Sequence, residues 1–172
     1  LALDDFTSST LEVNFEKVSN DNYLKLFKLD SPFILENRDV LESVVKLDLA
    51  NEDYDLTTSF EMYETLSGSN SDRYQYVLPS YNFSKNFDLE KIKGSFNFNS
   101  YGSNNLKNTN ITTSTLSNDL NFTSFNFFFD NGFKTNFEIL LKNINTTGNN
   151  NPKYKNSPQS EFLSAYNYNI SL

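Results

Sequence analysis

The chain has 172 residues, of which 14 are Lys or Arg and 22 are Asp or Glu, so its formal net charge at pH 7 is −8. It contains no His and no Cys, which excludes Ser-His-Asp and Cys-His nucleophiles, thiol redox chemistry and ordinary zinc sites. An acidic chain is a poor candidate for binding nucleic acid, because phosphate recognition needs clustered Lys and Arg. No run of about 18 apolar residues predicts a transmembrane helix.

Apolar and polar residues alternate at every second position, a pattern that begins at residues 11–15 and is typical of strands with two different faces. Residues 41–49 carry apolar side chains on one parity and mostly polar or charged ones on the other. The sequence Asn51-Glu52-Asp53 predicts a turn, after which residues 54–62 continue the alternation. We therefore expect a hairpin with one apolar face and one charged or hydroxyl-bearing face.

The middle of the chain predicts three more strands, two of them irregular. Residues 74–83 alternate but contain Pro79, which cannot donate to a sheet ladder and so predicts a bend. Residues 95–99 alternate Phe with Ser and Asn. In residues 120–129 the Phe residues change parity near Ser124, which predicts a β-bulge.

The last part of the chain predicts a hairpin and a final strand. Asp130-Asn131-Gly132 is a strong tight-turn signal, followed by a return strand over residues 133–142. A last strand is expected over residues 162–170. Two longer connections complete the chain: a short helical turn is expected at residues 22–27, and a mobile, solvated loop is expected at residues 143–159, which contain Gly, Pro and a run of Asn.

These patterns predict about eight strands of about 9–12 residues each, longer than the usual soluble strand of about 5–6 residues and long enough to cross a bilayer. The expected fold is all-β: an antiparallel up-and-down meander that is part of a large transmembrane outer-membrane β-barrel. Residues 1–172 would form one partial barrel domain. Because the chain starts at Leu1 and the alternation continues towards Leu172, we expect it to be an internal fragment of a longer protein.

Four carboxylates are candidate site residues on the polar face of the expected hairpin: Glu42, Asp48, Asp55 and Glu61. They would face a water-filled lumen, where they could bind a cation or guide a polar headgroup. The alternative is an ordinary hydrated sheet face. Their spacing does not single out an acid and a nucleophile of the kind a glycosidase needs, so we expect no enzymatic activity, no cofactor and no metal site.

Two acidic segments are candidate calcium ligands, because this ion prefers hard oxygen donors. They are Asp4-Asp5 and Asn51-Glu52-Asp53. Neither segment follows the twelve-residue pattern of a helix–loop–helix calcium site, and ordinary turn chemistry is the favoured interpretation.

Aromatic residues gather beside the expected tight turn, at residues 125–129. Such a cluster fits side chains that face lipid or lie at the membrane interface. A ligand-stacking platform and the core of a soluble sandwich are the alternatives. The residues expected to face lipid or the interface are Phe60, Phe96, Phe98, Phe125, Phe127 and Phe129.

Several segments, taken in chain order, resemble parts of one barrel family. The strand Leu11–Val18 leads into a Tyr-Leu step at Ser19–Leu24, and Tyr54–Glu64 is an aromatic strand. Arg73–Pro79, with its two Tyr residues before the Leu-Pro step, is similar to a Tyr-x-x-Leu-Pro entry into a strand. A long Asn-rich hairpin follows at Asn118–Asn145. Together they resemble the barrel domain of the LPS-assembly outer-membrane protein family (LptD, also called organic solvent tolerance protein).

The resemblance implies a β-barrel translocon that assembles lipopolysaccharide into the outer leaflet of the outer membrane of a Gram-negative bacterium. The partners implied are lipopolysaccharide itself, a lipoprotein that plugs the barrel, and periplasmic proteins that bridge the two membranes. The paired cysteines of the family have no counterpart in this chain, and no residue role is carried over.

Two alternatives stay open on the residues alone. One is a different outer-membrane barrel, such as a porin or an uptake receptor. The other is a secreted β-sandwich that acts as a binding or adhesion module and buries the same apolar faces between two sheets. One continuous, curved meander of long strands favours a barrel, whereas shorter strands in two facing sheets favour the sandwich.

Overall fold

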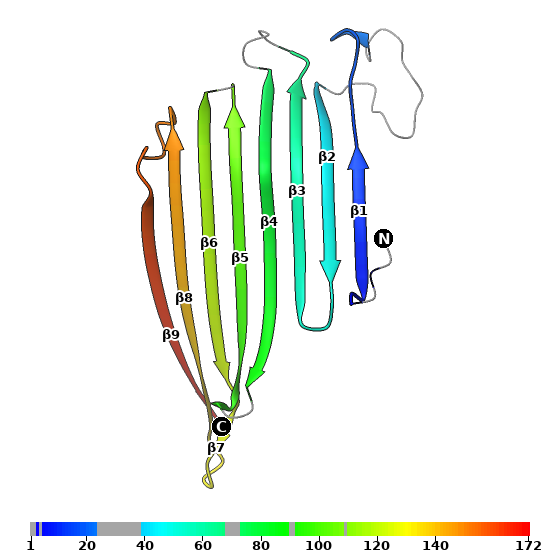
Figure 1. The fold of residues 1–172 in the computed structure, drawn as a ribbon. Helices are drawn as coiled ribbons and strands as arrows, with labels where there is room; N and C mark the ends of the chain where they lie inside the picture. Colours follow the sequence, from blue (N-terminus) through cyan, green and yellow to red (C-terminus); the bar gives the residue numbers. More distant parts are fainter. Residues whose placement is uncertain (1–2, 4, 24–38, 68–72, 90–91, 109) are drawn as a thin grey trace.

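The computed structural model describes the chain except for residues 1–2, 4, 24–38, 68–72, 90–91 and 109. All strands in the described part belong to one antiparallel sheet, in which sheet neighbours follow one another along the chain (Figure 1). The strands are β1 (Ser8–Asn14), β2 (Val40–Ala50), β3 (Tyr54–Thr65), β4 (Tyr74–Leu89), β5 (Gly94–Lys107), β6 (Ile111–Ser124), β7 (Phe127–Phe128), β8 (Lys134–Asn149) and β9 (Gln159–Ser171).

This architecture confirms the expected all-β, up-and-down meander. Eight strands of 7 to 16 residues match the eight expected ones in number, and β1 is shorter than expected. β7 is a two-residue strand that pairs with the start of β8. β1 and β9 form the two edges of an open sheet. The described strands form no second, facing sheet, so the sandwich arrangement is not found in this part of the chain.

Several strands are longer than the sequence predicts. β4 and β8 each have 16 residues, and β5 and β6 each have 14. The prediction of a loop from residue 143 was therefore wrong for residues 143–149, which continue β8 and pair with β6 as far as Asn149. Backbone groups make these ladder bonds whatever the side chain, so a polar Asn- and Thr-rich stretch can remain a strand. The connection itself covers residues 150–158.

β4 contains the irregularity expected at its proline. The two residues Leu78–Pro79 lie opposite one residue of β3, Phe60, and one residue of β5, Asn104. This β-bulge shifts the aromatic side chains of β4 from even positions such as Tyr76 to odd positions such as Tyr81. The aromatic residues of β4 therefore stay on one face of the sheet despite their change of parity.

The second parity change also coincides with a bulge. Thr123 of β6 is opposite Glu138, whereas Phe127 of β7 is opposite Thr135, so one extra residue lies on the β6–β7 side of the ladder. The turn beyond is tight, as predicted: Gly132 has φ of +87°, a conformation that favours glycine.

One small core lies at the end of the sheet where the β1–β2 connection begins. Val18 and Tyr23 of that connection pack on Leu41 of β2 and on Leu66, just after β3. Elsewhere the described chain is a single layer, and no large side chain is fully buried. The helical turn expected at residues 22–27 lies almost wholly outside the described residues.

Candidate functional site

The sheet has two chemically different faces. Residues directly opposite each other in neighbouring strands point to the same side, so the observed register assigns each strand position to a face. We call one side the apolar face. It carries Leu11, Val13, Leu41, Val45, Leu47, Leu49, Leu56, Phe60, Met62, Tyr76, Tyr81, Phe83, Phe96, Phe98, Leu120, Phe122, Phe137, Ile139, Leu141, Phe162, Tyr166, Tyr168 and Ile170.

Charged side chains separate sharply between the two faces. Only Glu64 and Lys85 lie on the apolar face of the described strands, and the Lys85 ammonium is 4.9 Å from the centre of the Phe87 ring. The opposite side, which we call the polar face, carries Glu12, Glu42, Lys46, Asp48, Asp55, Glu61, Lys107, Asp119, Lys134, Glu138, Lys142 and Glu161. This uneven division of charge shows that the faces are built for different surroundings.

Most of the apolar face is uncovered. Phe162 is 81% exposed, Tyr166 is 74% exposed and Leu141 is 44% exposed, whereas only four hydrophobic residues of the described chain are buried. Soluble monomers rarely expose a continuous apolar surface of more than a few hundred Å², and larger ones mark contact with membrane or protein.

Aromatic rings form a ladder on this face near residues 125–133, the tight turn and its flanking Phe residues, which we call the Phe-rich hairpin. The ring centres of Phe96 and Phe122 are 4.6 Å apart, and those of Phe122 and Phe137 are 5.5 Å apart. Phe127 stacks on Phe137 at 6.4 Å, with the two rings nearly parallel. These are the distances at which aromatic pairs attract each other beyond simple burial.

The aromatic candidates from the sequence divide into two groups. Phe60, Phe96, Phe98 and Phe127 lie on the apolar face. Two others, Phe125 and Phe129, lie in the connection between β6 and β8 and are 50% and 53% exposed. Whether they contact lipid stays a prediction.

All four candidate carboxylates lie on the polar face, but they fall into two separate groups, Glu42 with Glu61 and Asp48 with Asp55. Tyr63 joins Glu42 and Glu61, because its hydroxyl donates to Glu61 at 2.7 Å and lies 3.4 Å from Glu42. The Ser59 hydroxyl also donates to Glu61, at 2.5 Å, and is 2.6 Å from that of Ser80. Both carboxylates are thus satisfied by hydroxyl groups.

The other two carboxylates lie nearer the β2–β3 turn. Asp48 accepts a hydrogen bond from the Thr57 hydroxyl at 2.7 Å and forms an ion pair with Lys46 at 3.0 Å. Asp55 is opposite Ala50, close to the turn. Within the described residues no three acidic side chains gather in a way that would hold a metal ion.

Sequence reasoning missed the partners that cross-link the polar face. Lys142 of β8 forms an ion pair with Asp119 of β6 at 2.9 Å, and Asn97 donates to Asn86 across β4 and β5 at 2.6 Å. The residues are visible in the sequence, but their pairing depends on register, which no local pattern reveals.

The candidate calcium segments show ordinary turn chemistry. The Asn51 side chain accepts hydrogen bonds from the backbone amides of Asp53 and Tyr54, both at 2.9 Å. Asp5 and Glu52 line the same shallow hollow as this turn, whereas Asp4 lies outside the described residues.

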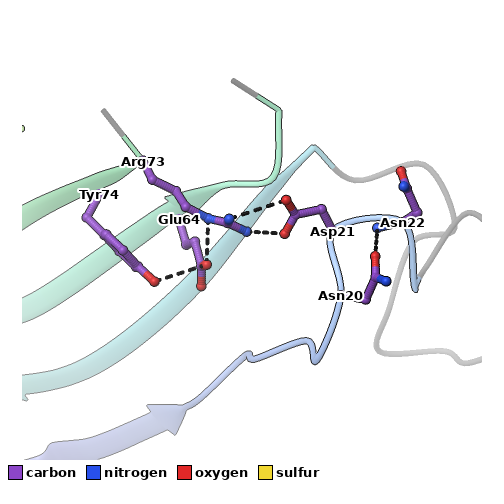
Figure 2. A network of polar contacts seen from close by, with 6 residues as sticks. All are labelled: Asn20, Asp21, Asn22, Glu64, Arg73 and Tyr74. Atoms are coloured by element: carbon purple, nitrogen blue, oxygen red, sulfur yellow. Dashed lines mark hydrogen bonds and ion pairs between the residues drawn. The ribbon is translucent and has the colours of Figure 1, made fainter. Parts of the chain in front are cut away.

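A separate polar network anchors the β1–β2 connection (Figure 2). The Arg73 guanidinium binds both oxygens of Asp21 in that connection and forms an ion pair with Glu64 of β3 at 2.8 Å. The Tyr74 hydroxyl donates to Glu64 at 3.1 Å. Hydrogen bonding to Asp21 is the main cause that raises the pKa of Arg73, so the guanidinium stays charged and holds the segment around Asp21 against the sheet.

A scan against protein-family models and a search of curated proteins both find no match for this chain. None of the described residues belongs to a helix long and apolar enough to span a membrane.

Proposed function

We propose that the chain forms part of the wall of an outer-membrane β-barrel, and that this barrel assembles lipopolysaccharide into the outer leaflet. In this role the apolar face contacts acyl chains and the polar face lines an aqueous lumen. A closed sheet is required because hydrocarbon cannot satisfy unpaired backbone groups. This part of the chain would form a passage and would do no covalent chemistry.

One observation carries the membrane part of this proposal. We call the stretch of each strand that bears apolar side chains on the apolar face the apolar band, and a row of residues directly opposite one another in successive strands a rung. The apolar band runs obliquely across the rungs. On β2 the band extends from Leu41 to Leu49 and is centred on Val45, opposite Phe60. Phe60 lies beside the β4 bulge, and on the far side of the bulge the same rung continues through Asn104, Ser114 and Thr147 of β5, β6 and β8. A rung that is apolar at one side of the sheet is therefore polar at the other.

A second rung lies in the middle of the apolar band on β9, and it is apolar on every strand that it crosses. It runs from Tyr166 through Ile139, Phe122 and Phe96 to Phe87 of β4. It then leaves the sheet, because β3 begins at Tyr54, which lies opposite Lys85, two residues before Phe87 on β4. Across the sheet the apolar band therefore shifts steadily towards the end that carries the Phe-rich hairpin.

The size of the shift gives a tilt. The two rungs are eight residues apart on β5, from Phe96 to Asn104, and six strand-to-strand steps separate β2 from β9. With a rise of about 3.3 Å per residue and a strand spacing of about 4.8 Å, the band crosses the strands as if they were tilted by about 40°. Strands of outer-membrane barrels tilt by about 35–45°. A nine-residue band at this tilt is about 20 Å tall between its outer Cα atoms, close to the apolar height of about 25 Å in such barrels.

The cargo part of the proposal is supported by the family resemblance. The aromatic strand Tyr54–Glu64 coincides with β3, and the Leu-Pro step at Leu78–Pro79 is the bulge of β4. Lipopolysaccharide, its lipoprotein plug and its periplasmic bridge proteins are the partners that this resemblance implies.

Spin labels can test the membrane arrangement. This chain has no Cys, so single cysteines can be introduced from Ile139 to Lys142 of β8 and labelled selectively in protein that carries no other Cys and is reconstituted in lipid vesicles. Labels at 139 and 141 should be relaxed by lipid-soluble oxygen, and labels at 140 and 142 by a water-soluble nickel chelate. A label at Thr147, on the apolar face but above the band, should respond to nickel. Equal nickel access at all five sites would refute the membrane wall.

A cellular experiment tests the cargo. Depletion of the protein in the bacterium that encodes it should lower surface-exposed lipopolysaccharide while leaving its synthesis unchanged. If surface lipopolysaccharide is unaffected and uptake of small solutes falls, the barrel is a porin or an uptake receptor, and the assembly role is wrong.

A further inference from the structure

Three shallow hollows lie one after another on the apolar face of β5, β6, β8 and β9. The upper hollow, of about 310 Å³, lies at the end of the sheet next to Pro158. The middle hollow, of about 370 Å³, begins at Asn118 and Asn143. The lower hollow, of about 350 Å³, shares Leu120 and Leu141 with the middle one. Each is within the size range of small-ligand sites. The upper hollow ends at Leu116 and Asn145, the apolar-face neighbours of Asn118 and Asn143 in the middle hollow, and we call this row of three hollows the groove.

The upper hollow combines an apolar surface with polar side-chain groups that have hydrogen-bonding capacity left over. Its floor includes the Tyr81 ring, which covers Gly102: a Cβ on that glycine would be 2.4 Å from the ring. Asn104 and Ser114 make no side-chain hydrogen bond within the described part of the chain, and the amide oxygen of Asn145 accepts none there. Such groups can both donate to and accept from a ligand's hydroxyls.

The lower hollow has the opposite character. Seven side chains line it and all are apolar, among them Phe96, Phe122, Phe137 and Ile139. The boundary between the two environments is a polar row at Ser100, where the Ser100 hydroxyl donates to Asn118 at 2.8 Å and meets the Tyr81 hydroxyl at 3.0 Å.

The groove is also placed correctly along the apolar band. On β6 and β8 the band covers the lower and middle hollows, and Ser114, Asn145 and Thr147 of the upper hollow lie beyond its edge. In the proposed membrane the lower part would therefore be at acyl-chain depth and the upper part at headgroup depth.

We propose that this groove binds a glycolipid, with its sugar headgroup in the upper hollow and an acyl chain along the lower one. The inference rests on the proposed membrane location. A pyranose ring has carbon-hydrogen faces and a rim of hydroxyls, which match the carbon floor and the rim of amides and hydroxyls in the upper hollow.

Charge favours a sugar over a phosphate headgroup. Phosphate recognition uses Lys or Arg, yet none of the residues that line the upper hollow is Lys, Arg, Asp or Glu, in a chain with 14 Lys or Arg and 22 Asp or Glu residues. The ligand at this place is therefore hydroxyl-rich and uncharged.

Lipid competition tests this inference. The protein is placed in lipid discs containing equal amounts of digalactosyl diacylglycerol, phosphatidylcholine and phosphatidylglycerol with identical acyl chains, and retained lipids are counted by native mass spectrometry. The test variant combines Ser114→Ala with Asn145→Leu. The matched control is Asn121→Leu, which changes the same residue type on the polar face of β6.

We expect the natural protein and the control to retain the galactolipid about tenfold over phosphatidylcholine, as two hydrogen bonds would give. The double variant should lose this preference and keep the same total lipid. Equal retention of all three lipids, a preference for phosphatidylglycerol, or a galactolipid preference that survives the double variant would each refute the sugar site and leave the barrel intact. Failure to enter the discs and retain any lipid would refute the proposed membrane location as well. If the double variant alone fails to enter the lipid discs, the sugar site is tested by the same competition on the natural protein and on the single variant Ser114→Ala.

Discussion

A lysine introduced at Leu120 tests the central physical claim, that hydrocarbon covers the apolar face. Leu120 lies on β6 between Phe98 of β5 and Leu141 of β8, close to the middle of the band on these strands. A lysine at the midplane of a barrel's lipid face costs about 2–4 kcal/mol of folding free energy. We expect Leu120→Lys to lower the free energy of unfolding from lipid vesicles by that amount.

Two control lysines on the same strand separate the effect of the face from the effect of depth in the membrane. Asn121→Lys places the charge on the polar face, where water is available, and should change the free energy of unfolding by less than about 0.5 kcal/mol. Leu116→Lys places it on the apolar face four residues higher, which at a tilt of about 40° is about 10 Å nearer the membrane surface. There the expected cost is about 0–1 kcal/mol, because the penalty falls towards the interface.

Urea titration of vesicle-bound protein, followed by circular dichroism of the strands and by the mobility difference between folded and heat-unfolded forms on gels, gives the three free energies. Equal costs for Leu120→Lys and Asn121→Lys would mean that water covers both faces. Equal costs for Leu120→Lys and Leu116→Lys would mean that a protein layer, and not a bilayer of limited thickness, covers the apolar face. Either result refutes the reasoning.

Three further changes have definite expected outcomes. Gly94→Ala should lower the free energy of unfolding by about 1–3 kcal/mol in the same titration, because its Cβ would lie 2.4 Å from the Phe122 ring; no loss of stability would contradict this packing. Arg73→Met should speed hydrogen exchange in the β1–β2 connection about five- to tenfold by removing the bond to Asp21, and unchanged exchange would show that the ion pairs do not hold the connection. Tyr63→Phe should cost about 1 kcal/mol by removing the donor shared by two carboxylates, and a neutral result would show that water replaces it.

The alternation of apolar and polar side chains predicted the strands. The prediction of secondary structure was wrong where that alternation is missing. The Asn- and Thr-rich end of β8 reads as a loop, yet residues 143–149 pair with β6, because a neighbouring strand supplies the backbone bonds. Pro79 predicted a bend in β4 and the parity change near Ser124 predicted a bulge, and the structure has a bulge at both places. Each marks a place where the chain would otherwise turn its aromatic residues to the wrong face.

For the candidate carboxylates, the sequence predicted the face of the sheet but not the hydrogen-bond partners. The parity of Glu42, Asp48, Asp55 and Glu61 assigns all four to one face, as the structure confirms. That Tyr63 links two of them depends on the register between β2 and β3.

The sequence by itself determined the all-β class, the number of long strands and the chemistry of each face, because side chains on a strand alternate with a period of two and so record what each face meets. Only the tertiary structure decided the register, and with it the slant of the apolar band and the alignment of the hollows along one groove. Register is a relation between strands whose residues are distant in the chain. It is set by the hydrophobic pattern of all strands together with the geometry of the turns that join them.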